Sequence, residues 1–274
     1  MPAFFCPHKP YNATMLRILI FHMFIFYLPY ATASNNSLTW DLMYFDYEEF
    51  DTTGFSRNHE TGFIPGLCAA LVRNQHELKM SLYNGRVDYD GYTQALIPHQ
   101  TKTNETLFKV FYRYNIQLNQ GIENPRYFLG IGHQYWMRSI QPNNGVYGLD
   151  ETYTWLQAEA GTQLTLLSEP NKSILLELAL LRTLNGNIRI NLDELGYGTP
   201  NLDLGNTFGF QGKIFWRIAT GQNQELETGV NYARWGFGRS NSKTLTNGFQ
   251  TITIEEPRSE SSQTIFYVGL NQYF

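Results

Sequence analysis

The sequence predicts an all-β fold, a transmembrane antiparallel up-and-down β-barrel of about ten strands. Three observations predict it. Apolar and polar residues alternate with a period of two, the connections between the alternating segments are short and long in turn, and charged residues make up only 16% of the 274 residues. An average soluble domain carries about a quarter charged residues. Barrels of about eight or twelve strands are the alternatives.

The N-terminal segment has the features of a secretory signal peptide. An apolar run at residues 18–28 follows Arg17 and precedes Ala31-Thr32-Ala33, a small-x-small cleavage pattern. Signal peptides combine a basic start, a short apolar core and small residues at the cleavage site. The core is shorter than the about 20 residues that a membrane-spanning helix needs. We therefore assign residues 1–33 to a signal peptide, with Met15 as the expected true start, and residues 34–274 to the barrel.

Strict alternation identifies the strands, because successive side chains of a strand point to opposite faces. The clearest segment is 107–118, where Tyr112 and Tyr114 share one face and Lys109 and Arg113 share the other. The segment at 63–72 is apolar on both faces and is the weakest assignment. The remaining segments lie at 38–44, 77–82, 127–138, 156–166, 176–183, 207–218, 226–232 and 266–274.

The connections support a barrel over a soluble β-sandwich. The short ones lie at 73–76, 119–125, 168–173 and 220–224, and the long ones at 49–61, 88–105, 139–151, 184–201 and 239–262. Short turns on one side and long loops on the other are typical of transmembrane barrels. The segments are also longer than the usual five or six residues of a soluble strand. We therefore expect one barrel with five long surface loops.

Charged residues on the polar face are expected to fill the lumen. A ten-stranded barrel encloses little space, and buried charges must pair or cost several kcal/mol each. We expect these side chains to form a salt-bridge plug, and a narrow porin-like channel for small polar solutes is the alternative. The expected network comprises Lys109, Arg113, Arg138, Glu159, Glu177, Lys213, Arg217 and Glu227.

The C-terminus resembles the assembly signal of bacterial outer-membrane β-barrel proteins. Phe274 ends the chain, and Phe266, Val268 and Leu270 share its face of the last segment. The family often has an aromatic residue two positions before the final Phe, whereas this sequence has Gln272 there. The resemblance implies a Gram-negative outer membrane, recognition by the barrel-assembly machinery, and contact with outer-membrane lipids and lipopolysaccharide.

One acidic motif resembles half of the active site of the omptin surface proteases. Asp88 and Asp90 could position a water molecule, and His99 could act as a base. The loop that should carry the second half offers Asp193 and Glu194 but no histidine. We therefore assign no catalytic residue, and an omptin-like protease remains the second alternative.

Other chemistries find little basis in the sequence. His133 and Ser139, the residue types of a barrel lipase, lie six positions apart on one segment without an organised motif. Neither metal-ligand spacing nor a cofactor motif appears. The net charge of −4 argues against nucleic-acid binding. We expect a structural or surface-recognition barrel whose loops bind an extracellular ligand of unknown type.

Overall fold

A computed structural model describes residues 35–92, 97–116 and 125–274. The expected signal peptide and the expected start at Met15 lie outside the described residues. Within the part of the chain that is described, no helix has the length and apolar character required to cross a membrane.

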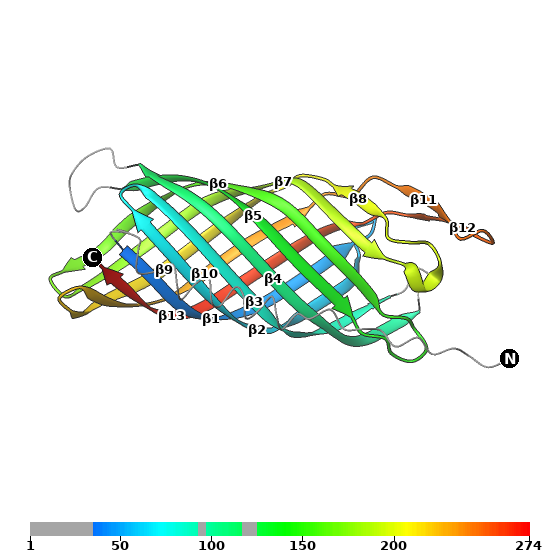
Figure 1. Ribbon diagram of the computed structural model, residues 1–274, viewed down its shortest axis with the longest axis horizontal. Coiled ribbons are helices and arrows are strands. Elements are labelled where there is room, and N and C mark those ends of the chain that lie inside the picture. The colour runs from blue at the N-terminus through cyan, green and yellow to red at the C-terminus, as the bar shows by residue number, and fades with distance from the viewer. Residues whose placement is uncertain (1–34, 93–96, 117–124) are drawn as a thin grey trace. The chain divides into compact units, whose positions relative to one another are not determined.

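Ten long antiparallel strands close into a barrel, as the sequence predicts (Figure 1). Each strand from β1 to β6 pairs with the next, β6 pairs with β7, and the circle continues through β9, β10 and β13 back to β1. The barrel strands are β1 (Asn35–Phe50), β2 (Ser56–Arg73), β3 (His76–Tyr92), β4 (Pro98–Ile116), β5 (Arg126–Ile140), β6 (Leu149–Glu169), β7 (Lys172–Asn191), β9 (Phe208–Gly221), β10 (Gln224–Phe237) and β13 (Arg258–Tyr273).

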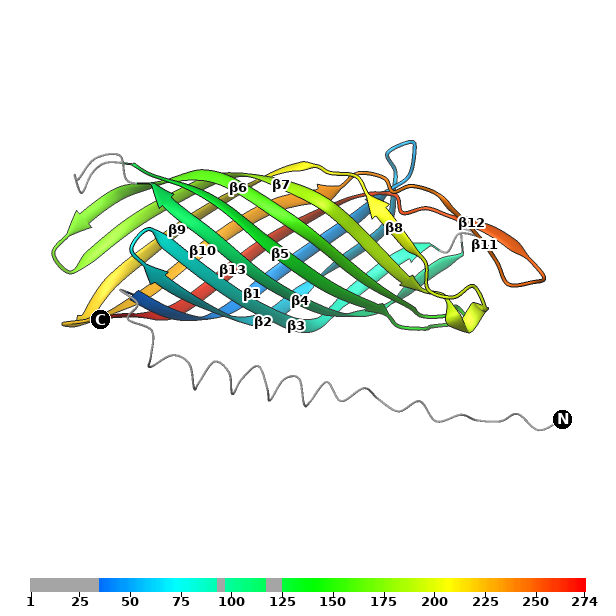
Figure 2. The ribbon, with the colours of Figure 1, turned by 45° about the horizontal axis from the view of Figure 1, so that its top comes forward.

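The two ends of the barrel differ. The C-terminus lies at the end where tight turns join β6 to β7 and β9 to β10, which we call the short-turn end (Figure 1). At the opposite loop end, smaller elements extend the wall (Figure 2). They are the 3-10 helix η2 (Asp193–Leu195), β8 (Asn201–Leu204), and the hairpin of β11 (Lys243–Thr246) and β12 (Thr251–Ile254).

The expected five long loops need correction. Residues 51–55 alone connect β1 to β2, and β5 and β6 are joined by residues 141–148. At the loop end, the long connections within the described part of the chain are those that contain β8 and the β11–β12 hairpin. The strands run further than expected because their inward side chains remain packed beyond the apolar outer band. Strand pairing therefore continues past the membrane-facing part of the wall on the loop side.

The outer wall carries the apolar face that the alternation predicts. Trp40, Phe63, Leu129 and Trp216 are among the large apolar side chains that lie exposed on it. Such a band replaces a soluble protein's polar surface where the wall contacts lipid. On β13, Phe266, Val268 and Leu270 of the expected assembly signal belong to this face, and Phe274 is exposed just after the strand.

A β-bulge in β7 corrects the expectation that residues 184–201 form a loop. Asn185 has a positive φ of 51°, and the register between β6 and β7 shifts at this point. The extra residue moves the inward face from odd to even positions. Ile188 and Ile190 therefore point into the barrel and are buried, in contrast to the exposed loop that the sequence predicts there.

Candidate functional site

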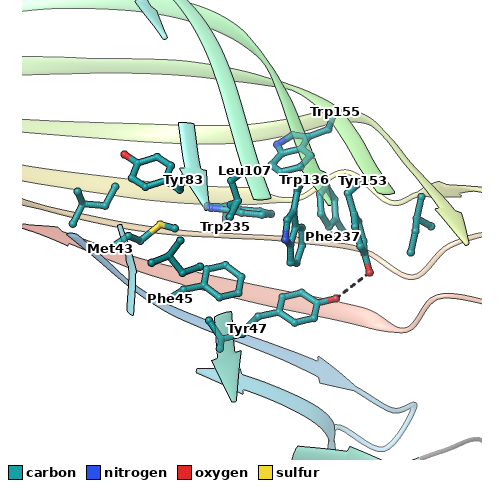
Figure 3. Packing of buried hydrophobic residues seen from close by; sticks show 14 of the residues in the cluster. Met43, Phe45, Tyr47, Tyr83, Leu107, Trp136, Tyr153, Trp155, Trp235 and Phe237 are labelled. Carbon is teal, nitrogen blue, oxygen red and sulfur yellow. Dashed lines mark hydrogen bonds between the residues drawn. The ribbon is translucent and has the colours of Figure 1, made fainter. Parts of the chain in front are cut away.

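The lumen is filled at the level of the loop end by an aromatic layer (Figure 3). We define this layer as Phe45, Tyr47, Trp136, Tyr153, Trp155, Trp235 and Phe237, each of which is at most 3% exposed. The rings of Trp136 and Tyr153 stack with centroids 4.6 Å apart, and Trp155 and Trp235 approach to 4.8 Å. Tightly packed interiors of this kind leave few voids as large as a water molecule.

The alternation pattern of the sequence places these aromatic side chains in the lumen, although the expected lumen network does not include them. Trp136 has the parity of Gln134 and Arg138, and Phe45 has the parity of Asp41, so both lie on the polar, inward face. Extending the alternation past the apolar outer band would have placed these aromatic side chains inside. At this level the lumen therefore holds aromatic rings in addition to the expected charged side chains.

Arg138 lies buried among three carboxylates beside the aromatic layer. Its Nη1 donates to Glu49 Oε1 at 2.8 Å and to Glu151 Oε2 at 2.7 Å, and its Nε donates to Glu60 Oε1 at 3.1 Å. The guanidinium carbon also lies 4.6 Å from the ring centroid of Tyr47. The sequence predicts Arg138 in the lumen, but it does not identify these three glutamates as its partners.

Further carboxylates surround this group. Glu105 accepts a hydrogen bond from Trp136 Nε1, and Glu256 accepts one from Tyr153 at 2.8 Å. Glu256 reaches the lumen from the loop between β12 and β13, where its backbone N–H donates to Ser240 Oγ at 2.7 Å. Burial raises the pKa of Glu256 well above the usual glutamate value, and the nearby carboxylates of Glu49 and Glu151 raise it further.

The other expected network residues surround a cavity of about 340 Å³ on the short-turn side of the aromatic layer. Arg113 Nε donates to Glu159 Oε1 at 2.8 Å, and its Nη1 donates to Glu177 Oε2 at 3.2 Å. Arg113 Nη1 also lies 3.8 Å from Glu77, which pairs with Lys79 at 3.3 Å. Charged side chains from four strands thus meet around one guanidinium at the cavity wall.

A second ion-pair group lies on β9 and β10 beside the first, since Lys213 is directly opposite Glu177 in the β7–β9 ladder. Lys213 Nζ donates to Glu227 Oε1 at 3.1 Å, and Arg217 Nε donates to Glu227 Oε2 at 2.9 Å. Tyr267 and Asn271 on β13 also donate to this carboxylate, at 3.0 and 3.3 Å. Glu227 is therefore fully hydrogen-bonded, as a buried carboxylate must be.

Lys109 differs from the other expected network residues. Its Nζ donates to Gln263 Oε1 at 2.8 Å across the lumen and lies 5.7 Å from the ring centroid of Tyr83. Among the described residues, it forms no ion pair within 4.0 Å. It faces the cavity at the boundary with the aromatic layer.

The structure does not bring the omptin-like candidates together. Asp88 and Asp90 lie exposed on the outer face of β3, where Asp88 pairs with Lys102 and Asp90 accepts from Gln100 at 3.4 Å. His99 points inward and is buried, with its Nε2 3.2 Å from the backbone oxygen of Gln141. The sequence contains a signal for this placement. Asp88 and Asp90 occupy even positions, as do the outward-facing residues of β3.

The remaining candidates are also apart. Asp193 and Glu194 lie exposed in η2, and Ser139 Oγ donates to Asp150 at 2.6 Å on the outer wall. His133 is exposed on the same outer face of β5. In the described ranges, no three His, Cys, Asp or Glu side chains are grouped to hold a metal ion.

Comparison with known proteins identifies the fold. No protein-family model matches the sequence, and no curated protein matches it either. The outer membrane protease OmpT from Escherichia coli is similar in structure, with a TM-score of 0.51 and 10% identity over 89% of this chain and 98% of that one. The translocator domain of the autotransporter NalP from Neisseria meningitidis has a TM-score of 0.40 and 9% identity over 96% of both chains.

The beta domain of the Bordetella autotransporter BrkA has a TM-score of 0.41 and 11% identity over 87% of this chain and 99% of that one. The likeness to OmpT, together with the closed ring of ten strands, leads to one conclusion: the chain has the fold of the bacterial outer-membrane β-barrel proteins.

Proposed function

We propose that the protein is a closed outer-membrane barrel that supports a recognition surface at its loop end and does not serve as a pore. The aromatic layer carries this proposal. Its rings occupy the lumen from wall to wall, and Trp136 and Tyr47 are completely buried. A solute that crossed the barrel would have to displace tightly packed rings, which costs several kcal/mol for each large side chain.

Exposed aromatic residues at the loop end form the recognition surface. Phe55, Tyr147 and Phe249 are 73%, 67% and 97% exposed, and each lies in a different connection. Aromatic side chains supply large contact area at low entropic cost and are enriched in binding surfaces. The ligand we propose is an extracellular molecule with apolar patches, presented outside the cell because short turns face the periplasm in such barrels.

The β11–β12 hairpin is connected to the neighbouring loop. Asn247 Nδ2 donates to the backbone oxygen of Leu195 at 3.3 Å. This contact orients the hairpin tip with Phe249 relative to η2, so part of the surface is preorganised. The apolar outer band would contact outer-membrane lipids and lipopolysaccharide, and the C-terminal residues around Phe274 would be read by the barrel-assembly machinery.

Planar-bilayer recording tests the closed lumen. We expect no steady single-channel conductance from the refolded full-length protein, while a porin measured in the same bilayers gives regular steps. Conductance steps of comparable size from this protein would contradict the proposal and favour the narrow channel.

A binding assay tests the recognition surface. We would immobilise a panel of extracellular proteins and polysaccharides and measure binding of the purified barrel. A variant with Phe55→Ser, Tyr147→Ser and Phe249→Ser should lose at least about tenfold in affinity for any binder, because hot-spot aromatics carry more than about 1.4 kcal/mol. Leu178→Ser, on the lipid-facing wall, is the control. Unchanged binding by the triple variant would refute the surface assignment.

The protease alternative makes a distinct claim. Asp88 and His99 point to opposite sides of the wall, whereas a water-positioning acid and a base need to face the same reacting atom. We expect no cleavage of a basic peptide by cells that display the protein. Cleavage by the wild type that Asp88→Ala and His99→Ala both abolish would establish the alternative.

A further inference from the structure

Among the described residues, Lys109 and Asp41 have no ionic partner where the cavity meets the aromatic layer. Of the charged side chains that line this cavity inside the barrel wall, Arg113, Lys79, Lys213 and Arg217 pair with glutamates. Lys109 and Asp41 do not join these pairs, and no ion pair connects them to each other among the described residues. Both line the same cavity.

Neutral groups hold the two charges apart. Asp41 Oδ1 accepts from Thr39 Oγ1 at 2.7 Å, and its Oδ2 accepts from Tyr83 at 2.7 Å. Tyr83 also contacts Lys109, whose Nζ is 5.7 Å from the ring centroid. Opposite charges in a poorly solvated interior attract strongly. Because neither charge has an ionic partner among the described residues, a ligand in the cavity with both an anionic and a cationic group would pair with both.

Buried amide atoms without partners lie at the same level. Gln134 is 3% exposed and its Oε1 has no hydrogen-bond partner, and Gln263 is 1% exposed and its Nε2 has none. Both residues line the cavity. Gln134 lies directly opposite Lys109 in the β4–β5 ladder, and Gln263 accepts from Lys109. A buried polar atom left without a partner costs about 1–3 kcal/mol, so such atoms point to a bound group.

We propose that this cavity binds a small zwitterion that carries one carboxylate and one ammonium group, such as a free amino acid or a dipeptide. The carboxylate contacts Lys109 Nζ and the free amide hydrogens of Gln263, and the ammonium group contacts Asp41. The apolar side chains of Trp235 and Ile265 line the cavity beside these groups and contact the ligand's carbon atoms. The ligand enters from the short-turn end, opposite to the recognition surface, so this inference is independent of the proposed function.

Isothermal titration of the refolded full-length protein in detergent tests the ligand class without any mutation. We would titrate L-alanine, L-alanyl-L-alanine, acetate and methylammonium separately. At least one of the two zwitterions should bind at least about tenfold more tightly than acetate and methylammonium, since each single-charge probe uses only one of the two sites. The tighter of the two zwitterions distinguishes an amino-acid site from a dipeptide site, and either result supports the proposal.

Matched variants test the residues. Lys109→Gln and Asp41→Asn should each weaken zwitterion binding at least about tenfold, whereas Lys172→Gln should not, because Lys172 is exposed and pairs with Glu169 at the turn after β6. Heat-modifiable migration on a denaturing gel verifies that each variant forms a barrel. Absence of zwitterion binding to the wild type at millimolar concentration, equal binding of acetate, or unchanged binding by both folded variants would overturn the proposal.

Discussion

Two arginines in the lumen have the same number of acidic neighbours but lie in different surroundings. Arg138 contacts Glu49, Glu60 and Glu151 beside the aromatic layer, where its side chain is 1% exposed. Arg113 lies at the wall of the cavity, where its side chain is 7% exposed. Two of its carboxylate neighbours, Glu177 at 9% and Glu77 at 14%, are more exposed than any of the three around Arg138, which are at most 6% exposed.

The two halves of the barrel surround their ion pairs differently. On the loop side, rings exclude water, so the charges depend entirely on one another and on hydrogen bonds. On the short-turn side, a cavity of about 340 Å³ adjoins the pairs, and water can solvate a charge that loses its partner. The same chemical motif therefore lies in a closely packed interior in one half and at the wall of a polar cavity in the other.

The largest expected effect separates the two arginines. Arg138→Met should lower the free energy of unfolding by about 5 kcal/mol, and Arg113→Met by about 3 kcal/mol, because breaking a buried pair costs about 3–5 kcal/mol and cavity water reduces the cost. Urea unfolding in lipid vesicles measures both. Equal losses would remove the distinction between a dry and a hydrated half.

A second pair of variants compares aromatic side chains in the two halves. Phe45→Ala should cost about 3–4 kcal/mol, since Phe45 is fully buried in the aromatic layer. Phe111→Ala should cost less, because Phe111 lines the cavity and is only partly buried. The midpoint of urea unfolding is again the measurement. A larger loss of unfolding free energy for Phe111→Ala would contradict the assignment of the more tightly packed core to the loop-side half.

The pH dependence sharpens the comparison on the loop side. Because the pKa of Glu256 is raised in the folded state, its stabilising contribution is complete below the ordinary glutamate pKa of about 4.3. It is lost as pH rises from there toward the folded-state pKa, by up to about 1.4 kcal/mol per pH unit. Glu256→Gln keeps the acceptor for Tyr153 and should flatten this slope. Melting temperatures measured in detergent from about pH 4 to about pH 8 test it, and identical slopes would contradict it.

The smallest effect on stability is expected for the C-terminal residue. Phe274 is 76% exposed after the end of β13, so its deletion should change the unfolding free energy by less than about 0.5 kcal/mol. Cells should nevertheless assemble less of the deletion variant if the C-terminal residues are the assembly signal that we propose. Immunoblots of unheated outer-membrane fractions measure the assembled amount, and an unchanged amount would refute the role of Phe274.

Alternation predicted much of the fold because it reports on a local property. A strand places successive side chains on opposite faces, so the positions of Tyr112 and Arg113 on the two faces of β4 follow from neighbouring residues alone. The same parity rule places Asp88 outside and Trp136 inside once the strands are extended beyond the apolar outer band. It fails only where the backbone inserts a residue, as at Asn185 in β7.

The sequence by itself determined a barrel of about ten strands, the membrane-facing surface and the inward position of charges such as Arg113 and Arg138. Only the tertiary structure decided which carboxylates surround each arginine, that rings fill one half of the lumen, and that Lys109 and Asp41 form no ion pair with the described residues in the other. The reason is that alternation fixes the face of each side chain, whereas its partners come from strands far away in the chain. Arg138, for example, meets Glu49 from β1, a contact set by how the sheet closes and staggers.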